Sequence, residues 1–200
     1  MKVLVIVAQP NRASFNHAIA QTCSRALTDN GHEVIAHDLY REQFDPILPH
    51  DEVPSGAKLP ADIQRHCEEA ATTEGMIIVH PNWWGQPPAI LKGWVDRVLR
   101  PGVAYEFLEG DQGEGIPRGL LRAKCAIIFN TSNTETTREQ TVFGDPLEAI
   151  WKDCIFSLCG VPTTYRRTFN VVVTSSEADR KRWLSEVVDT INRFFPRGVT

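Results

Sequence analysis

Apolar runs alternate with amphipathic segments along this chain of 200 residues. The runs 2–8, 76–79 and 125–129 are rich in β-branched residues and alternate little, as expected of parallel strands buried on both faces. Weaker strand patterns lie at 33–39 and 163–173. Between these strands, apolar positions recur at helical spacing. This rhythm predicts an α/β fold in which right-handed crossover helices connect five parallel strands.

Prolines and capping residues mark where several of the predicted helices begin. Ser14, and Ser176 followed by Asp179, have side chains suited to cap a helix amino terminus. Asp145 with Pro146 marks a further helix start. Helical spacing places six residues of that helix inward: Leu147, Ile150, Trp151, Cys154, Ile155 and Leu158. The cysteine in this set is therefore expected to be a core residue.

Other segments differ in how regular they are. Residues 61–73 and 89–99 have helical spacing, and the second of these ends before Pro101. Residues 40–60 carry prolines and charges without a period, and a loop of this length suggests a binding or interface role. Residues 100–122 are rich in glycine and predict an irregular insertion or a hairpin. No internal repeat divides the chain, so we expect one domain over residues 1–200.

Composition narrows the function classes. A hydrophobic content of 42% suits a sizeable core, and a net charge of -4 with mixed signs predicts no nucleic-acid partner. The first apolar run is too short for a secretory signal or a membrane span, so we expect no membrane insertion and a cytoplasmic location. The five cysteines include no CxxC pair, which predicts neither a disulfide framework nor a metal site.

Three polar loops follow predicted strands at their carboxyl ends, where open α/β sheets bind ligands. They span residues 9–16, 81–88 and 130–134. The first lacks the glycine signatures of dinucleotide and nucleotide sites. Ser14, Arg12 and the first N–H groups of the helix could nevertheless hold an anion, and an ordinary capped helix is the alternative.

Trp83 and Trp84 in the second loop have two interpretations. They could stack on a planar ligand, or they could fill the core or a subunit interface. The nearby His80 is typical of a packed histidine at a strand end. The sequence indicates no Ser-His-Asp set and no paired carboxylates, so catalytic residues are not identified. Any redox chemistry would then require a bound organic cofactor.

The stretch PNWWGQPPAILKGWVDRV at 81–98 resembles the flavin loop and following helix of the NAD(P)H quinone reductases, which have the flavodoxin-like fold. AQPNRASFN at 8–16 and DLYREQFDPIL at 38–48 agree in order and spacing, and weaker agreement extends to the CG at 159–160. The resemblance implies a three-layer sandwich with a five-stranded parallel sheet in the order 2-1-3-4-5. It also implies a homodimeric oxidoreductase that passes a hydride from NAD(P)H through FAD or FMN to a quinone or similar acceptor, by a ping-pong route.

Site residues carry over from the resemblance by position. The phosphate or ribityl part of the flavin would be held by Gln9, Ser14, Phe15 and Asn16. The isoalloxazine would be lined by Pro81, Asn82, Trp83, Trp84 and Gly85, and its other edge by Thr131, Ser132 and Asn133. Two alternatives have a different function: an ancillary flavoprotein subunit of a potassium efflux transporter, and a non-catalytic electron carrier. The first loop disfavours the carrier, because it lacks the glycine- and hydroxyl-rich phosphate loop of flavodoxins.

Several positions depart from the mammalian family pattern. Gln9 replaces a histidine and Gly85 an aromatic residue, while Ser132 and Asn133 replace paired glycines. The tyrosine and histidine near the hydride site fall at Arg138 and Phe143, which makes Arg138 a candidate for stabilising a flavin anion. The candidate anchors for a 2′-phosphate are Arg12, Arg100, Arg118 and Arg138.

Overall fold

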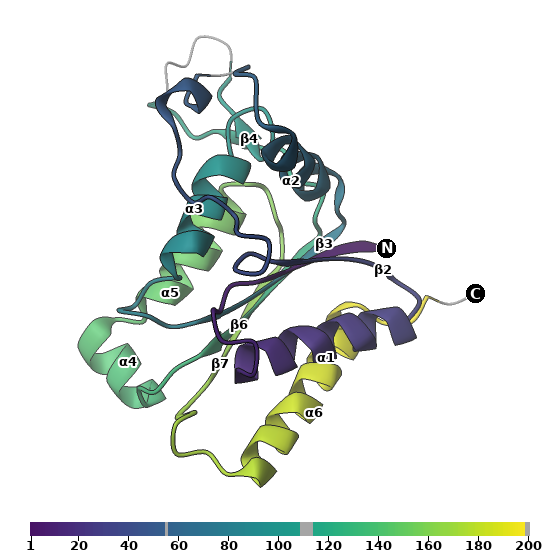
Figure 1. Ribbon diagram of the computed structural model, residues 1–200, viewed down its shortest axis with the longest axis vertical. Coiled ribbons are helices and arrows are strands. Elements are labelled where there is room, and N and C mark those ends of the chain that lie inside the picture. Colours follow the sequence, from purple (N-terminus) through teal and green to yellow (C-terminus); the bar gives the residue numbers. More distant parts are fainter. Residues whose placement is uncertain (55, 109–113, 199–200) are drawn as a thin grey trace.

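The computed structural model describes residues 1–54, 56–108 and 114–198. Its parallel sheet consists of β1 (Lys2–Val7), β2 (Glu33–Asp38), β3 (Gly75–Pro81), β6 (Cys125–Thr131) and β7 (Thr164–Phe169), shown in Figure 1. The strand order is β2-β1-β3-β6-β7. When the short strands β4 and β5 of a separate sheet are set aside, this is the order 2-1-3-4-5, so the predicted fold is confirmed. The carboxyl ends of β1, β3 and β6 share one edge of the sheet, beside the point where the strand order reverses.

Helices cover both faces of the sheet (Figure 1). On one face lie α1 (Phe15–Asp29) and α6 (Glu177–Phe194), which contact each other. The other face carries α2 (Ala61–Thr72), α3 (Ala89–Val98) and the segment formed by α5 (Pro146–Glu148) and η2 (Ala149–Ser157). Successive residues of β1 enter different cores, because Val5 packs toward α1 and Ile6 toward α2 and α3. This explains why the central strands have continuous apolar sequences.

The helix after Pro146 differs from the prediction. Residues 149–157 form a π-helix, so the buried positions are Trp151 and Phe156, five residues apart. Cys154 is exposed and Leu158 is 36% exposed. The prediction that both face inward is wrong, because it assumed 3.6 residues per turn, whereas i→i+5 bonding widens the turn.

Two features outside the main sheet were harder to predict. The insertion at 100–122 contains an antiparallel pair, β4 (Tyr105–Glu106) with β5 (Arg118–Gly119), which confirms the hairpin alternative. Residues 109–113 of this insertion lie outside the described part of the chain. No pattern in the sequence predicts α4 (Thr136–Phe143). This helix buries none of its residues and therefore has no apolar face to reveal it.

The long segment 40–60 is fastened to the helices of its face and includes the short 3-10 helix η1 (His50–Glu52). The guanidinium of Arg97 on α3 binds the Glu52 carboxylate through Nε at 3.0 Å and Nη2 at 2.5 Å, and both side chains are buried. Arg97 also donates to the carbonyl of Asp45. Gly93 allows this close approach, since a Cβ there would lie 2.2 Å from the carbonyl oxygen of Pro46. The segment is thus anchored by buried ion pairing and tight backbone packing.

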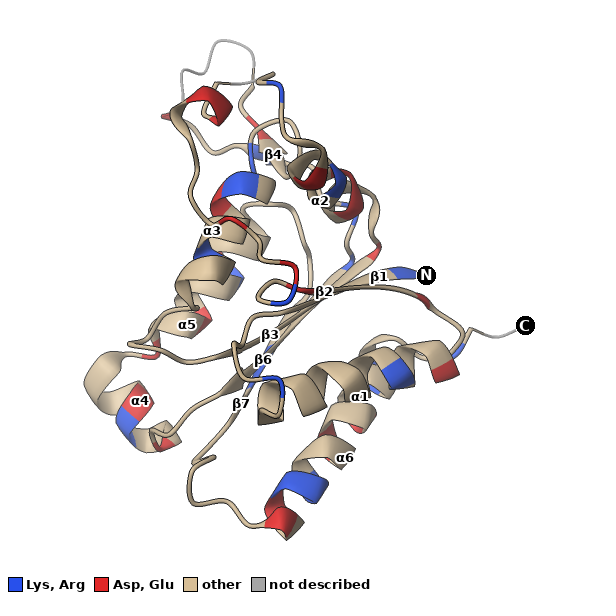
Figure 2. Cartoon of the chain, viewed as in Figure 1, with Lys and Arg blue, Asp and Glu red and all other residues tan. Residues whose placement is uncertain are grey.

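Charged residues of both signs are interspersed over the surface helices (Figure 2). Blue and red segments alternate along α2, α3 and α6 in that view, and the net charge is -4. In the described part of the chain, no helix is both long and apolar enough to cross a membrane.

Candidate functional site

A cavity of about 720 Å³ opens at the carboxyl ends of β1, β3 and β6. Its lining includes every residue that the family resemblance assigns to a flavin: Gln9, Ser14, Phe15, Asn16, Pro81, Asn82, Trp83, Trp84, Gly85, Thr131, Ser132 and Asn133. The other lining residues are Thr134, Glu139, Phe143, Pro146 and Val172. The fold therefore brings all three predicted loops together around one space, within the size range of small-molecule sites.

The amino end of α1 forms one wall of this cavity. Ser14 caps the helix by accepting a hydrogen bond from the backbone N–H of His17, as the sequence predicted. Asn16 is almost fully buried, and its Nδ2 donates to the Thr131 hydroxyl at 2.8 Å. Its carbonyl oxygen Oδ1 has no hydrogen-bond partner among the described residues. A buried polar atom without a partner at a cavity wall is typical of a group that binds a ligand.

The loop after β3 forms a second wall and contains a tight turn. Trp83 and Gln86 exchange two backbone hydrogen bonds, at 3.1 and 3.0 Å, around Trp84 and Gly85. These two residues have φ values of 57° and 70°, which match a type I′ turn. The turn pushes Trp84 outward, where it is 99% exposed, and leaves Trp83 41% exposed. Neither indole lies in the core of this chain, so ligand stacking and a subunit interface are the interpretations that remain.

A third wall comes from the segment after β6 and from α4. The backbone N–H of Asn82 donates to the carbonyl of Thr131 at 2.7 Å, which ties the second and third loops together. The side chain of Asn82 donates to a carboxylate oxygen of Glu139 on α4 at 3.0 Å and accepts from the N–H of Gly85. The helix that the sequence did not predict thus supplies a carboxylate to the cavity.

A buried hydrogen-bond network supports the cavity floor from below. His80 on β3 donates from Nδ1 to the Pro81 carbonyl at 2.8 Å, and its Nε2 accepts from Trp151 and Asn130. Asn130 in turn accepts from Arg166 on β7 at 3.2 Å. Burial lowers the pKa of His80 to about 4, so the ring is neutral at pH 7. This confirms a packed histidine that positions the loop and does not face a substrate.

Positive charge is scarce at the cavity. Glu139 is the one charged residue in the described lining. The guanidinium carbon of Arg138 lies 5.5 Å from the centre of the Phe143 ring, and Arg138 itself is not among the lining residues. Arg100 is buried against the carbonyls of Glu52 and Pro54, and Arg118 pairs with Glu106. Neither Arg100 nor Arg118 belongs to the described lining of the cavity, so the structure does not bring these two candidate anchors to this site.

The structure also contains a hydrogen-bonded Ser-His-Asp chain, which the sequence did not indicate. The Ser14 hydroxyl lies 3.0 Å from Nδ1 of His17, whose Nε2 lies 3.0 Å from Oδ2 of Asp38 at the end of β2. Ser14 lines the cavity, and His17 lies one helical turn behind it. Twenty-one positions separate His17 from Asp38. Only the packing of α1 beside β2 brings them together, so no local spacing could have indicated the contact.

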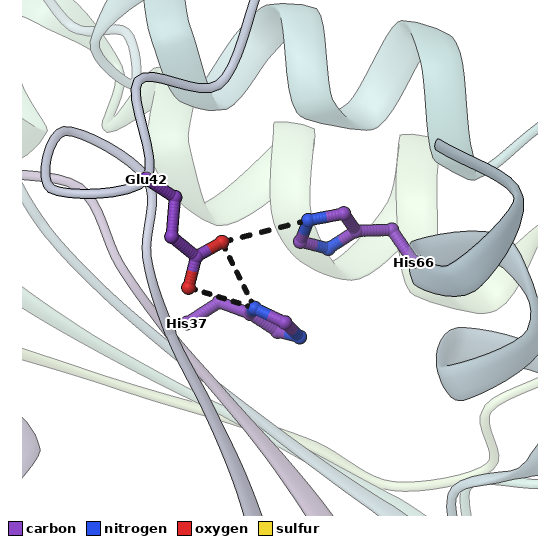
Figure 3. A group of neighbouring side chains, drawn as sticks. All are labelled: His37, Glu42 and His66. Carbon is purple, nitrogen blue, oxygen red and sulfur yellow. Dashed lines mark hydrogen bonds and ion pairs between the residues drawn. The ribbon is translucent and has the colours of Figure 1, made fainter. Parts of the chain in front are cut away.

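A second polar cluster lies on the other face of the sheet, between β2, the following loop and α2. Figure 3 shows the carboxylate of Glu42 between the rings of His37 and His66. Nδ1 of His37 lies 2.9 Å from this carboxylate, and Nε2 lies 2.6 Å from Glu69. Nε2 of His66 is 3.6 Å from Glu42. Because both nitrogens of His37 face carboxylates, which only accept hydrogen bonds, both carry a hydrogen and the ring is positively charged.

The pKa values in this cluster reflect mutual attraction that outweighs burial. Burial acts to lower the pKa of His37, but hydrogen bonds and attraction from Glu42 and Glu69 raise it. Burial likewise acts to raise the pKa of Glu42, but His37 and His66 lower it to about 2. The cluster is therefore a charged structural network at neutral pH.

The donor set does not fit a metal ion. The ligand atoms of His37, Glu42 and His66 lie within 4.8 Å of one another. The indole N–H of Trp94, however, donates to Nδ1 of His66 at 3.3 Å, so the hydrogen of this ring is on Nε2, the atom that faces Glu42. Coordination of a metal through Nε2 would move that hydrogen to Nδ1, where it would face the indole N–H of Trp94 with no acceptor between the two donors.

Comparison with known proteins identifies the relatives of this chain. A family model described as "Flavodoxin-like fold" matches residues 1–191. An uncharacterized NAD(P)H oxidoreductase of Haemophilus influenzae is 34% identical over 186 residues, which cover 90% of this chain and 89% of the relative. NAD(P)H dehydrogenase [quinone] 1 of Rattus norvegicus is 30% identical and is matched over 80% of this chain and 65% of its own length. The solved structure of Smu.1420 from Streptococcus mutans superposes with a TM-score of 0.82 at 27% identity, covering 96% of this chain and 100% of that protein.

Proposed function

We propose that this chain binds a flavin and transfers a hydride from NAD(P)H to a quinone or similar acceptor. The proposal starts from the family: the chain belongs to the flavodoxin-like fold family, which includes NAD(P)H oxidoreductases, and it is an enzyme of that kind. One observation carries the proposal. All residues that the resemblance assigns to a flavin line one cavity at the carboxyl edge of the sheet, where folds of this type bind their ligands. We propose that residues 1–200 form a single flavin-binding domain.

Several features of the cavity support binding of a flavin phosphate. The first N–H groups of α1, a helix of 15 residues, have no intrahelical acceptors and carry the positive end of the helix dipole. The unpaired Oδ1 of Asn16 offers one more polar contact. Because the Thr131 hydroxyl can accept or donate, a half-turn of the Asn16 amide exchanges this free acceptor for a free NH₂ donor. Ser14 and Asn16 would therefore hold the phosphate and ribityl part.

The isoalloxazine would lie on the loop after β3. When bound, the flavin supplies the hydride acceptor and donor that the chain's own side chains do not provide. The proline at 81 and the type I′ turn at Trp84 hold this loop in shape, and the bond from Asn82 to Thr131 fixes it to β6. Backbone N–H groups held in place in this way can stabilise negative charge on a reduced ring without reorganising.

A second copy of the chain would complete the cavity. Apolar side chains at or beside its rim are exposed, with Trp84 at 99%, Val142 at 62% and Phe143 at 49%. Exposed apolar groups gathered at a cavity mouth are typical of an interface. We therefore infer a homodimer in which the partner covers the open side, and in which NAD(P)H and the acceptor use the same space in turn.

The experiment combines cofactor identity with turnover. The mass of the flavin released on denaturation identifies FAD or FMN. Flavin-loaded protein is then mixed anaerobically with NADH and, separately, with NADPH. We expect the flavin absorbance to bleach and to return when a quinone is added. Protein that binds flavin but is not bleached by either nucleotide would contradict the enzyme and favour a carrier or a regulatory flavoprotein.

A pair of asparagine variants tests the location of the site. Asn16→Leu removes the amide at the cavity wall, and we expect flavin occupancy to fall at least about tenfold, as for the loss of hydrogen bonds to a charged group. Asn192→Leu changes an exposed asparagine on α6 outside the cavity and should leave occupancy unchanged. Equal occupancy in both variants would place the flavin elsewhere.

A further inference from the structure

The Ser14–His17–Asp38 chain connects the cavity to a titratable group behind it. Ser14 lines the cavity, whereas His17 and Asp38 line a separate groove beside α1 and β2. The side chains of His17 and Asp38 are 10% and 20% exposed. The other oxygen of Asp38 accepts from the backbone N–H of Arg41 at 3.1 Å, which holds the carboxylate in place. Each link is short enough to transmit a change in hydrogen position.

The position of each hydrogen follows from the donor inventory. A carboxylate only accepts, so Nε2 of His17 carries a hydrogen that points at Asp38. In a neutral ring, Nδ1 is then an acceptor and takes the hydroxyl hydrogen of Ser14. The Ser14 oxygen also accepts from the backbone N–H of His17 at 3.3 Å. With neutral His17, Ser14 therefore has no hydrogen to donate into the cavity and presents an oxygen lone pair there.

Protonation of His17 reverses this arrangement. Nδ1 then donates to the Ser14 oxygen, and the hydroxyl hydrogen is free to point into the cavity. The imidazolium also brings a positive charge one turn behind the amino end of α1. This matters because the described lining contains Glu139 and neither lysine nor arginine, although the proposed ligand carries phosphate.

We propose that binding of the flavin phosphate is coupled to the uptake of one proton by His17, which turns Ser14 into a donor and supplies the positive charge that the lining lacks. His17 and Asp38 are positioning residues in this scheme, and the inference rests on the proposed function. Other charged or titratable groups line the same groove as His17, on α1, on β2 and in the segment after it: Arg25, Asp29, His37, Arg41 and Glu42. Of the histidines in that groove, His37 is already committed to two carboxylates, which leaves His17 as the proton acceptor.

The test is calorimetric titration of the flavin-free protein with FMN, FAD and riboflavin, in pairs of buffers that differ in ionisation enthalpy. Proton uptake is measured from about pH 6.5 to 9; above about pH 7 the FMN phosphate is itself a dianion. We expect uptake to reach nearly one proton with FMN and FAD, and to be absent with riboflavin, which has no phosphate. Over the range of maximal uptake, affinity for FMN should fall about tenfold per pH unit.

Matched histidine variants assign the proton. His17→Gln should abolish the uptake and weaken FMN binding about tenfold while leaving riboflavin affinity unchanged. Asp38→Asn should reduce the uptake, because the charge that favours the imidazolium is lost. His50→Gln changes an exposed histidine on η1 and should behave as wild type. If His17→Gln does not fold, the wild-type titration still decides the question.

The outcomes separate the inference from the proposed function. Uptake below about 0.2 proton with both FMN and FAD over the whole pH range would overturn the coupling, as would full uptake in His17→Gln. Failure of the wild-type protein to bind any of the three flavins would instead overturn the proposed function.

Discussion

The two polar regions of the molecule use their hydrogen-bonding groups in opposite ways. Each ring nitrogen of His37 and His66 faces a carboxylate or the Trp94 indole. The nearby guanidinium of Arg97 is paired with the carboxylate of Glu52. At the cavity, the Asn16 carbonyl has no partner, and Trp84 is exposed. A network whose donors and acceptors are all matched holds a loop in place, whereas a wall with unmatched groups can bind a ligand. This difference, more than polarity itself, separates the His37 cluster from the cavity wall.

The largest expected effect on stability comes from removing one partner of the buried Arg97–Glu52 ion pair. Arg97→Met leaves the Glu52 carboxylate buried without its partner, so we expect unfolding free energy to fall by about 3–5 kcal/mol. Lys92→Met on the same helix removes an exposed pair with Asp96 and should cost no more than about 0.5 kcal/mol. Urea unfolding measures both. Similar losses in the two variants would show that the buried pair does not anchor residues 40–60.

A smaller effect is expected from altering the turn of the cavity loop. In Gly85→Ala, the new Cβ would lie 2.7 Å from Cγ of Pro146 at a φ of +70°. We expect a loss of about 1–3 kcal/mol in unfolding free energy and weaker flavin binding, because the loop must move. Gly31→Ala has the same type of strain at φ +82°, with no atom within 4 Å of the new Cβ, and serves as the control. Equal flavin affinity in both variants would contradict a role for this turn in the site.

The buried His37 should make the stability of the protein depend on pH. The folded pKa of His37 is raised, so its contribution is fully present below the unfolded value of about 6.5 and is lost as pH rises through the folded pKa. The stability advantage of wild type over His37→Gln should therefore shrink as the pH rises above about 6.5. His50→Gln should show no such trend in urea unfolding. A constant difference between wild type and His37→Gln would mean that the ring is not charged in the folded protein.

The smallest effect on stability is expected for the most exposed indole. Trp84→Ala removes a side chain that is 99% exposed, so unfolding free energy of the monomer should change by less than about 0.5 kcal/mol. Sedimentation should nevertheless show weaker self-association, because this residue lies at the inferred interface. A stability loss above about 1 kcal/mol, with association unchanged, would assign Trp84 a role within its own chain.

Much of the fold was predictable because the central strands are buried on both faces. The runs at β1, β3 and β6 are continuously apolar, which is typical of strands buried on both faces. Because these strands are parallel, the loops that follow them lie at one edge of the sheet. The position of the three loops around the cavity followed from topology in the same way, whereas the individual candidate flavin residues came from the family resemblance. The predicted capping box between Ser176 and Asp179 is confirmed, and it was predictable because the two residues are only three positions apart.

Contacts between distant segments were not predictable in this way. His37 and Glu69 are 32 positions apart, and His17 and Asp38 are 21 apart; each pair meets only because a helix packs beside β2. Cys154 was misplaced for a different reason, since helix type depends on packing that periodicity does not record. The sequence alone could place residues on elements, but it could not show which polar groups would find partners.

The π-helix at 149–157 is a place in the core where one residue could be deleted without losing the buried aromatic residues. Trp151 and Phe156 are five residues apart, and the residues between them include the exposed Lys152, Asp153 and Cys154. Deleting Asp153 would bring the two aromatic residues to α-helical spacing, with both still on the inner face. This segment is therefore the place where a homologous chain could be one residue shorter and retain the same aromatic core beneath the cavity.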